Sequence, residues 1–308
     1  MADTNTPAAL VYGTAWKEDK TAELTEEAIK QGFIVVDTAN YPTAYNEPLT
    51  GDGIAAAIEK GVVKRSDLFI QTKFSPLWAH DKDKIPFDAN KTIEEQVRES
   101  VQQSLDHLHT DYLDSLLLHA PYPDDADTLA AWRALEALVP HTARVIGVSN
   151  VDLQQLQAVY AASTSEATRP AIVQNRFYRG TGFDSDVRAF AREHGITYQA
   201  FWMLRHNPEV LESSVLAAAA EKLAVEPELA FYVLLVALGE SEDGSGKPAI
   251  QVLDGTTKTH RMQQDLKVIS EVFGKPGSGQ RSSILQDLQP DIAAFRALLE
   301  ELAAKNDD

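Results

Sequence analysis

Residues 92–119 read TIEEQVRESVQQSLDHLHTDYLDSLLLH, and a helical pattern in this stretch leads into a strand pattern. Apolar residues such as Val97 and Val101 recur at intervals of three and four, which predicts an amphipathic helix over Thr92–Leu108. Ser115–His119 is apolar without polar alternation, which is typical of a strand buried on both faces. A helix that leads into such a strand indicates an α/β fold.

The same alternation runs along most of the chain. Eight short apolar runs are candidate strands: Leu10–Gly13, Ile34–Asp37, Leu68–Thr72, Ser115–His119, Val145–Val148, Ile172–Asn175, Thr197–Phe201 and Ala249–Leu253. The helical segments between and after them are Thr21–Lys30, Thr50–Lys60, Thr92–Leu108, Ala126–Leu138, Asp152–Ala161, Ser185–Glu193, Glu209–Leu238 (broken near Pro227) and Thr259–Phe273. Eight strands alternating with eight helices predict a (β/α)₈ TIM barrel. An open doubly wound sheet has the same alternation and is the alternative.

We expect a single barrel domain over residues 1–273, followed by a Gly/Ser-rich linker and a C-terminal helix within residues 274–308. That helix is predicted over Pro290–Lys305. Two stretches do not fit the repeat. Pro76–Asn90 reads as an inserted loop after the third strand, and Gly239–Lys247 reads as an acidic loop before the eighth.

Composition and charge exclude several classes of protein. The chain has 308 residues, 44% hydrophobic and 24% charged, which is ordinary for a globular protein and excludes disorder along the whole chain. It has no cysteine, so disulfides and thiolate metal sites are excluded and a reducing compartment is favoured. No signal peptide and no bilayer-spanning run are visible, so we expect a cytoplasmic protein without a membrane partner. The net charge of −18 argues against nucleic acid as a partner.

Polar side chains stand at the ends of three successive predicted strands. Asp37 ends the second, Lys73 follows the third, and His119 ends the fourth. The carboxyl ends of barrel strands face the active site, so an acid, an ammonium and an imidazole would converge there. Each residue has an ordinary explanation by itself, as a solvated lysine or a hydrogen-bonded core histidine. Their shared position at strand ends favours a catalytic site.

Seven short motifs at strand ends together resemble the aldo-keto reductase superfamily. They are Gly13-Thr14, Val36-Asp37-Thr38-Ala39, Tyr45-Asn46-Glu47, Gln71-Thr72-Lys73, Leu117-Leu118-His119, Gly147-Val148-Ser149-Asn150 and Val173-Gln174-Asn175. The resemblance runs from Gly13 to about Asp265. It implies a TIM barrel that reduces an aldehyde or ketone with NADP(H), with NAD(H) as the alternative cofactor.

By this resemblance the catalytic residues are Asp37, Tyr45, Lys73 and His119. The usual spacing would place the tyrosine at position 42, where this chain has proline, so an apparent insertion delays the match to Tyr45. A lengthened loop of this kind resembles a fungal-type branch of the family. The competing proton donor is the tyrosine at position 41. A phenol is a weak acid at neutral pH, and a nearby lysine ammonium makes its proton easier to transfer.

The resemblance also implies a set of cofactor-binding residues. Ser149, Asn150 and Gln174 would hold the nicotinamide carboxamide. Phe201 falls where the family stacks an aromatic ring on the nicotinamide. The next three residues usually read Ser-Pro-Leu and here read Trp-Met-Leu, so Leu204 is the one retained position of the expected pyrophosphate loop.

The part expected to bind the adenosine end departs further from the family. Gly255 stands where a phosphate-binding lysine is common, and Asp265 adds negative charge. Thr256 and Arg261 are the expected cofactor-binding residues here, with Lys258 as an alternative cation. A guanidinium can bind a 2′-phosphate through two parallel hydrogen bonds.

Trp16 and Trp78 are candidates for the substrate pocket, although each can equally be an aromatic residue that covers the barrel mouth. Two other classes of function remain open. A non-catalytic nicotinamide-nucleotide-binding regulatory subunit would use the same barrel. A metal-dependent barrel hydrolase would need clustered ligands at strand ends, where only Asp37 and His119 qualify, so no metal is expected.

Overall fold

A computed structural model describes residues 8–239, 249–274 and 282–305 of the chain. The eight strands form a closed barrel in the order β1 to β8, and the pairings between neighbours are parallel. Their bounds are β1 Leu10–Gly13, β2 Val35–Asp37, β3 Phe69–Phe74, β4 Leu113–Leu118, β5 Ala143–Ser149, β6 Ile172–Arg176, β7 Thr197–Phe201 and β8 Ile250–Asp254. The predicted TIM barrel is confirmed, and the open doubly wound sheet is wrong.

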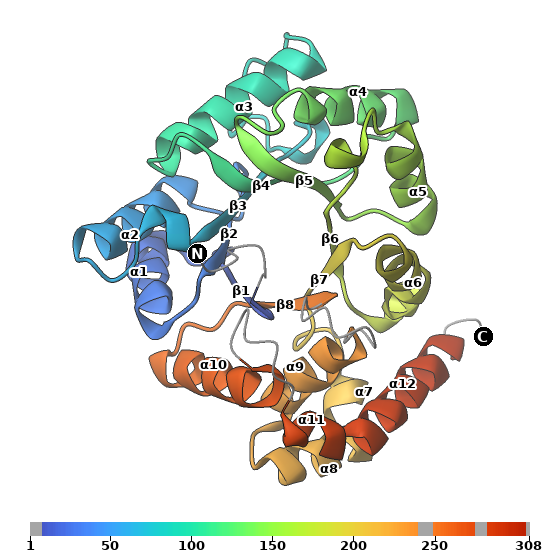
Figure 1. Cartoon of the computed structure of the whole chain (residues 1–308). Helices are drawn as coiled ribbons and strands as arrows, with labels where there is room; N and C mark the ends of the chain where they lie inside the picture. The colour runs from blue at the N-terminus through green and yellow to red at the C-terminus, as the bar shows by residue number, and fades with distance from the viewer. Residues whose placement is uncertain (1–7, 240–248, 275–281, 306–308) are drawn as a thin grey trace. The chain divides into compact units, whose positions relative to one another are not determined.

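The α-helices alternate with these strands and continue beyond the last one (Figure 1). They are α1 Thr21–Gln31, α2 Glu47–Glu59, α3 Ile93–His107, α4 Asp125–Glu136, α5 Leu153–Ala162, α6 Ser185–Glu193, α7 Pro208–Leu211, α8 Ser214–Leu223, α9 Pro227–Leu238, α10 Thr259–Phe273, α11 Ser283–Asp287 and α12 Gln289–Ala304. Most of the predicted acidic loop and of the predicted Gly/Ser-rich linker lies outside the described residues.

The segment predicted as one helix with a single break is three helices, α7, α8 and α9. Ser213 accepts a hydrogen bond from the backbone of Leu216 and starts α8. Ala224 ends α8 in a left-handed conformation, and Pro227 starts α9 at a position where its missing N–H costs nothing. Capping residues therefore divide into separate helices a segment that hydrophobic periodicity predicts as one helix.

Contacts divide the chain into two compact units. The amino-terminal unit comprises Val11–Gln174 and Asp254–Thr259, and the carboxy-terminal unit comprises the rest. The predicted division at residue 273 is a different one and stays a prediction.

In the amino-terminal unit, strand register brings the predicted site residues to neighbouring positions. Asp37 pairs with Gln71, and Ser149 pairs with Gln174. The helices α1 to α5 lie outside the strands that they connect (Figure 1). Helix α2 comes so close to the end of α3 that a Cβ on Gly51 would lie 1.8 Å from the carbonyl oxygen of His107. Glycine at this position therefore permits the approach of the two helices.

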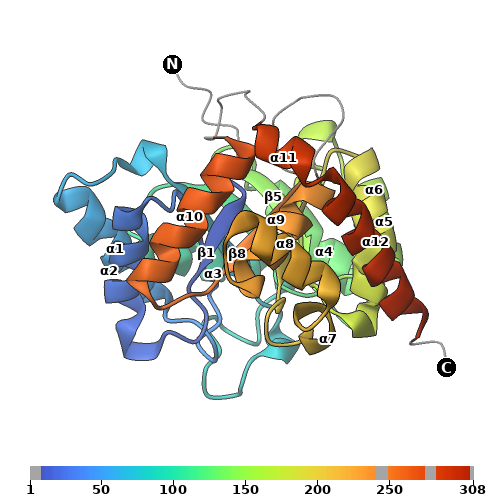
Figure 2. The same cartoon turned by 90° about the horizontal axis from the view of Figure 1, so that it is seen from below.

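In the carboxy-terminal unit, α9 carries the longest apolar run of the chain, and its residues from Leu229 to Leu238 are buried. Phe231 of α9 packs against Phe295 of α12, with ring centroids 5.7 Å apart. Helix α12 lies next to α8 and α9 (Figure 2). Among the residues described, none of the helices combines the length and the apolar character that crossing a membrane requires.

Candidate active site

Four polar residues of the amino-terminal unit come from consecutive elements. Asp37 is the last residue of β2, Lys73 lies in β3, and His119 directly follows β4. Tyr45 lies in the connection between β2 and α2. Strand pairing fixes the backbone of Asp37 and Lys73, so the geometry of these two residues does not depend on a flexible loop.

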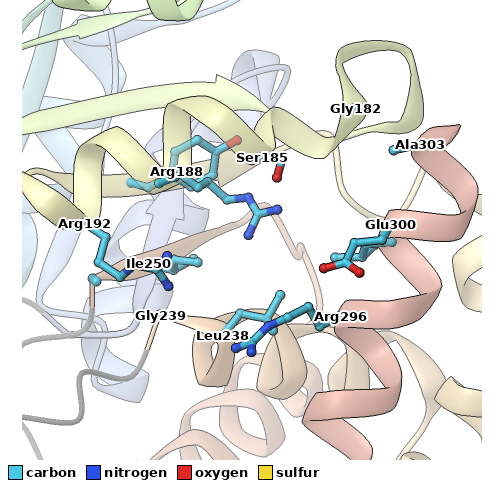
Figure 3. Close-up of a pocket in the computed structure, with 14 residues that line it drawn as sticks. Gly182, Ser185, Arg188, Arg192, Leu238, Gly239, Ile250, Arg296, Glu300 and Ala303 are labelled. Carbon is cyan, nitrogen blue, oxygen red and sulfur yellow. The ribbon is translucent and has the colours of Figure 1, made fainter. Parts of the chain in front are cut away.

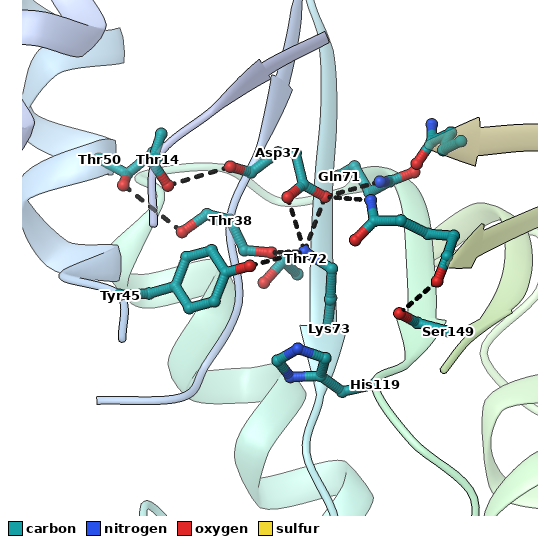
Figure 4. A network of polar contacts seen from close by, with 12 residues as sticks. Thr14, Asp37, Thr38, Tyr45, Thr50, Gln71, Thr72, Lys73, His119 and Ser149 are labelled. Carbon is teal, nitrogen blue, oxygen red and sulfur yellow. Dashed lines mark hydrogen bonds and ion pairs between the residues drawn. The ribbon is translucent and has the colours of Figure 1, made fainter. Parts of the chain in front are cut away.

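Lys73 is a fully buried cation held by three acceptors. Its ammonium nitrogen lies 2.7 Å from both carboxylate oxygens of Asp37 and 2.8 Å from the carbonyl oxygen of Thr38 (Figure 4). The side chains of Lys73 and Asp37 are 0% and 1% exposed. A buried charge survives only when it is paired and hydrogen-bonded, and these contacts satisfy that condition.

The hydroxyl of Tyr45 is a further partner of the same ammonium. Its oxygen lies 3.5 Å from the Lys73 nitrogen. Burial raises the pKa of Tyr45 above its ordinary value, the Lys73 ammonium lowers it, and Asp37 adds to the rise. Burial lowers the pKa of Lys73, yet Asp37 and Tyr45 together outweigh burial and leave that pKa raised. The pair is therefore a neutral phenol next to a charged ammonium around neutral pH.

The residues predicted to be an insertion before Tyr45 form one closed turn. The backbone N–H groups of Ala44 and Tyr45 both donate to the carbonyl of Tyr41, at 3.1 and 3.0 Å. Asn46 then caps α2 by accepting from the backbone of Leu49. Tyr41 instead places its ring edge-on to His119, with centroids 5.5 Å apart. Within the described part of the chain, Tyr45 is the tyrosine whose hydroxyl is hydrogen-bonded to Lys73. This contact supports Tyr45 over Tyr41 as the proton donor.

His119 is oriented by a residue that the sequence prediction missed. Its Nδ1 lies 2.7 Å from the hydroxyl oxygen of Ser75, and its backbone N–H donates to the carbonyl of Phe74. A neutral imidazole that accepts from the serine hydroxyl at Nδ1 carries its proton on Nε2. Ser75 comes two residues after Lys73, and alternate residues of an extended chain point to the same side. This spacing could have indicated that Ser75 lies on the same side as Lys73.

Glu47, two residues after Tyr45, is a second residue whose role the sequence prediction missed. Glu47 is 2% exposed and accepts hydrogen bonds from Thr72 and, at 3.1 Å, from Ser104. Its other contact is with Nδ1 of His107 at 3.0 Å. This carboxylate joins the start of α2 to β3 and to the end of α3, and so holds the segment that carries Tyr45.

Two glutamine side chains lie against the same Asp37 carboxylate. The amide nitrogen of Gln71 donates to Oδ1 of Asp37 at 2.7 Å, and that of Gln174 donates to the same oxygen at 3.0 Å. Gln71 was quoted in the sequence motif without a role. Its hydrogen bond, like that of Gln174, fixes the position of the carboxylate that holds Lys73.

The predicted carboxamide-binding residues are adjacent to this cluster. Ser149 donates to the carbonyl of Gln174 at 2.7 Å, and Asn150 donates to the carbonyl of His119 at 2.8 Å. Asn150 also donates to the Ser149 hydroxyl at 3.1 Å. One hydroxyl and two side-chain amides supply both donors and acceptors, and this chemistry fits a primary carboxamide.

Lys17 is a third missed residue and lies at the loop after β8. Its ammonium is 2.5 Å from the carbonyl oxygen of Gly255, and burial lowers its pKa to about 8 while Asp254 opposes the shift. A Cβ on Gly255 would lie 3.7 Å from this ammonium. Thr256 is fixed in the same loop by its backbone N–H, which donates to Asp254 at 2.9 Å. A cation therefore lies beside the position where the family lysine is missing.

The two predicted substrate-binding tryptophans are exposed. Trp16 is 71% exposed, and its backbone N–H donates to Ala44 in the turn before Tyr45. Trp78 is 54% exposed and lies in a short 3₁₀ helix, Leu77–Ala79, within the predicted inserted loop. Apolar surface of this size at two separate positions is available to a ligand.

Three further predicted cofactor-binding residues belong to the carboxy-terminal unit. Phe201 ends β7, and its carbonyl accepts from the backbone of Phe177. Leu204 follows in a turn and is half-buried, and Arg261 is exposed near the start of α10. Lys258, the alternative cation, is exposed in the amino-terminal unit.

Comparison with known proteins identifies what the chain is similar to. The family described as "Aldo/keto reductase family" matches residues 9–207. An NAD(P)H-dependent D-xylose reductase of Pachysolen tannophilus is 32% identical over 193 residues, which are 52% of this chain and 56% of that protein. The methylglyoxal reductase DkgB of Escherichia coli O157:H7 is 28% identical over 259 residues, 82% of each chain.

Solved structures share the fold. The crystal structure of Bombyx mori aldo-keto reductase (AKR2E4) in complex with NADP has a TM-score of 0.69 at 23% identity, over 94% of this chain and 88% of that one. An aldo/keto reductase from Brucella melitensis has the same TM-score at 22% identity, over 94% of each chain. The chain spans only part of some curated relatives: it covers 56% of the D-xylose reductase and 64% of an uncharacterized oxidoreductase of Schizosaccharomyces pombe.

Proposed function

Because the chain belongs to the aldo/keto reductase family, we propose that it reduces an aldehyde or ketone to an alcohol with a nicotinamide dinucleotide. The observation that carries the proposal is the Tyr45 hydroxyl 3.5 Å from the buried Lys73 ammonium, which is itself paired with Asp37. Such an arrangement can deliver a proton to a carbonyl oxygen in a site protected from water.

The bound cofactor supplies the hydride, and this chain's residues supply the proton and the geometry. Tyr45 is the proposed proton donor, because its raised pKa keeps the phenol protonated at neutral pH. Lys73 stabilises the phenolate that remains after the proton has left. Asp37 keeps the lysine charged and fixed in position.

His119 is the proposed residue that orients the substrate. In the tautomer that accepts from Ser75 at Nδ1, the Nε2–H of His119 would donate to the carbonyl oxygen. This hydrogen bond would place the carbonyl oxygen near the Tyr45 hydroxyl. The ring centroids of Tyr45 and His119 lie 6.0 Å apart. Position and protonation state are then both set before substrate binds.

Ser149, Asn150 and Gln174 are proposed to hold the nicotinamide carboxamide, with Phe201 stacking on the ring and Leu204 bordering the pyrophosphate. Thr256 and Arg261 are proposed to bind the adenosine 2′-phosphate, which would make NADPH the preferred cofactor. Lys17 adds a cation that supports this preference, because it lies beside Gly255. Trp16 and Trp78 are proposed to contact the substrate.

The alternatives have less support. None of the relatives reported above is named as a regulatory subunit. A metal-dependent hydrolase would need a cluster of ligands, and the residues that the structure describes contain no group of three His, Asp or Glu side chains placed to hold a metal. A cytoplasmic location and the lack of a nucleic-acid partner stay predictions from the sequence.

The direct test is an assay of purified protein with a panel of small aldehydes and ketones, with NADPH and NADH supplied separately. We expect cofactor oxidation that depends on the carbonyl compound and is faster with NADPH. Tight binding of either dinucleotide without turnover of any carbonyl would instead support the regulatory subunit.

A further inference from the structure

A cavity of about 380 Å³ lies within the carboxy-terminal unit, between α6 and α12 (Figure 3). Its floor includes Tyr198 of β7 and Ile250, the first residue of β8. The cavity is therefore at the amino ends of these strands, whereas Phe201 ends β7 and belongs to the proposed cofactor site. Nothing in the proposed reduction uses these lining residues.

Three arginines contribute to the lining. Arg188 and Arg192 are four residues apart on α6 and so share one face of the helix, and Arg296 comes from α12. Figure 3 shows the guanidinium of Arg188 extending into the cavity, with Arg296 across from it. The chain has 28 basic side chains against 46 acidic ones, so three guanidiniums at one cavity are a marked local excess of positive charge.

The surrounding contacts leave most of this charge available. Arg188 is positioned by donating from Nε to the carbonyl of Phe183 at 2.9 Å. Burial lowers the pKa of Arg188, and the charges of Tyr198 and Asp184 oppose this shift. The charges of Arg192 and Arg296 lower the pKa further, so the three guanidiniums are close enough to repel. Across residues 8–239, 249–274 and 282–305, the guanidiniums of Arg192 and Arg296 have no hydrogen bond or ion pair.

The acidic groups nearby do not balance the cluster. Glu300 is the carboxylate in the lining, and it faces the cavity from α12. Asp184 also attracts Arg188, but its Oδ2 accepts hydrogen bonds from Asn175 at 2.7 Å and from Tyr198 at 3.0 Å. Among the lining residues that the structure describes, three cations therefore face one carboxylate, an excess of positive charge.

We propose that this cavity binds a small organic phosphate monoester. Guanidinium groups match phosphate oxygens through paired N–H donors, and three of them can neutralise a dianion. The hydroxyl of Ser185 in the lining offers one more donor. Leu238, Ile250 and Leu299 supply apolar wall for the organic body, and the volume is within the range of small-molecule sites.

The test titrates glucose 6-phosphate into the full-length protein by calorimetry, with glucose, inorganic phosphate and citrate as comparison ligands. We expect saturable binding of glucose 6-phosphate and none of glucose. Inorganic phosphate should bind more weakly, because it has no organic body to contact the apolar wall. Citrate should also bind more weakly, because its carboxylates do not match a site for one tetrahedral dianion.

Matched variants assign the binding to the cavity. Arg192 and Arg296 are exposed, so R192Q and R296Q should fold, and the double variant should bind glucose 6-phosphate at least about tenfold more weakly. The control R98Q removes the same charge from α3, outside the cavity, and should bind normally. E300Q removes the lining carboxylate and should bind more tightly.

Three results would overturn the proposal. The first is unchanged binding in the R192Q/R296Q variant, which would locate the phosphate elsewhere. The second is weaker or unchanged binding in E300Q. The third is citrate binding as tightly as glucose 6-phosphate, which would indicate a general anion site without selectivity for phosphate.

Discussion

The ammonium nitrogen of Lys73 lies 2.7 Å from each carboxylate oxygen of Asp37, and neither side chain is accessible to solvent. Loss of one partner from such a pair typically costs about 3–5 kcal/mol of stability, because an uncompensated charge is left buried. The same pair sets the electrostatic environment of Tyr45, so stability and the proposed chemistry depend on the same contacts.

Lys73→Met should abolish carbonyl reduction. Loss of the ammonium removes the influence that lowers the pKa of Tyr45, so this pKa should rise further. Alcohol oxidation needs the phenolate, so its rate rises as the pH passes the tyrosine pKa, and this rising limb of the pH–rate profile should move to higher pH. Thermal unfolding should be compared with Lys60→Met, which removes an exposed lysine paired with Glu26. Near-normal rates in a folded Lys73→Met enzyme would rule out the assignment.

Tyr45→Phe should reduce turnover by about 100-fold or more, the usual scale of general acid catalysis, while cofactor binding is retained. Tyr41→Phe is the matched control, because this ring also contacts His119 but does not hydrogen-bond Lys73. Steady-state kinetics and dinucleotide titration of both variants make the comparison. If Tyr41→Phe is the inactive variant, Tyr41 is the proton donor.

Ser75→Ala should lower kcat by about tenfold, which is the scale of losing one charged or well-placed hydrogen bond. Cofactor affinity should change little. The loss frees His119 to adopt the tautomer that cannot donate from Nε2. Ser75→Thr keeps the hydroxyl and should recover most of the activity, whereas Ser66→Ala, at an exposed serine, should have no effect. Equal kcat in Ser75→Ala and the wild type would show that Ser75 does not orient the imidazole.

Cofactor affinity should fall as the pH rises through about 8. Lys17 has a folded-state pKa of about 8, below its usual 10.5, so its ammonium is lost as the pH passes that value. Dinucleotide titrations from neutral to mildly alkaline pH should show the decrease in the wild type. Lys17→Met should bind more weakly at neutral pH and lack the decrease. A wild-type affinity that stays constant over this range would exclude Lys17 from the cofactor site.

Arg261→Ala should raise the KM for NADPH by about tenfold or more, equivalent to a lost charged hydrogen bond of about 1.5–3 kcal/mol, and barely change that for NADH. Lys258→Ala tests the alternative cation in the same way. Equal KM values for NADPH and NADH in the unmodified protein would contradict the proposed preference for NADPH. They would indicate that a site with Gly255 in place of the lysine does not discriminate between the two cofactors.

Much of the fold was predictable because buried parallel strands leave a strong signal. The run at Leu116–Leu118 is apolar on both faces, and the structure places it in β4. Helix divisions were less predictable, because the end of α8 depends on the left-handed conformation of Ala224 and not on hydrophobic periodicity. The start of α2 at Glu47, three residues before the predicted Thr50, likewise depends on the Asn46 cap.

Site residues at the ends of strands could be predicted from the sequence. Site residues that meet only through tertiary contacts could not. Asp37 and Lys73 stand at strand ends, so their meeting followed from the barrel itself. Lys17 and Gly255 are 238 residues apart in sequence, and no local pattern indicates that they touch. Glu47 had a motif but no visible role, because its partners Ser104 and His107 come from a different helix.

Transfer of deuterium from the cofactor to the product tests the central claim most directly. The wild type is incubated with NADPH deuterated at both C4 positions of the nicotinamide and with methylglyoxal or another small aldehyde, and the alcohol is analysed by mass spectrometry. We expect one deuterium on the carbinol carbon with the wild type, and a strongly reduced yield of labelled alcohol with Tyr45→Phe. Alcohol without deuterium, or tight NADPH binding with no alcohol from any carbonyl tested, would contradict it.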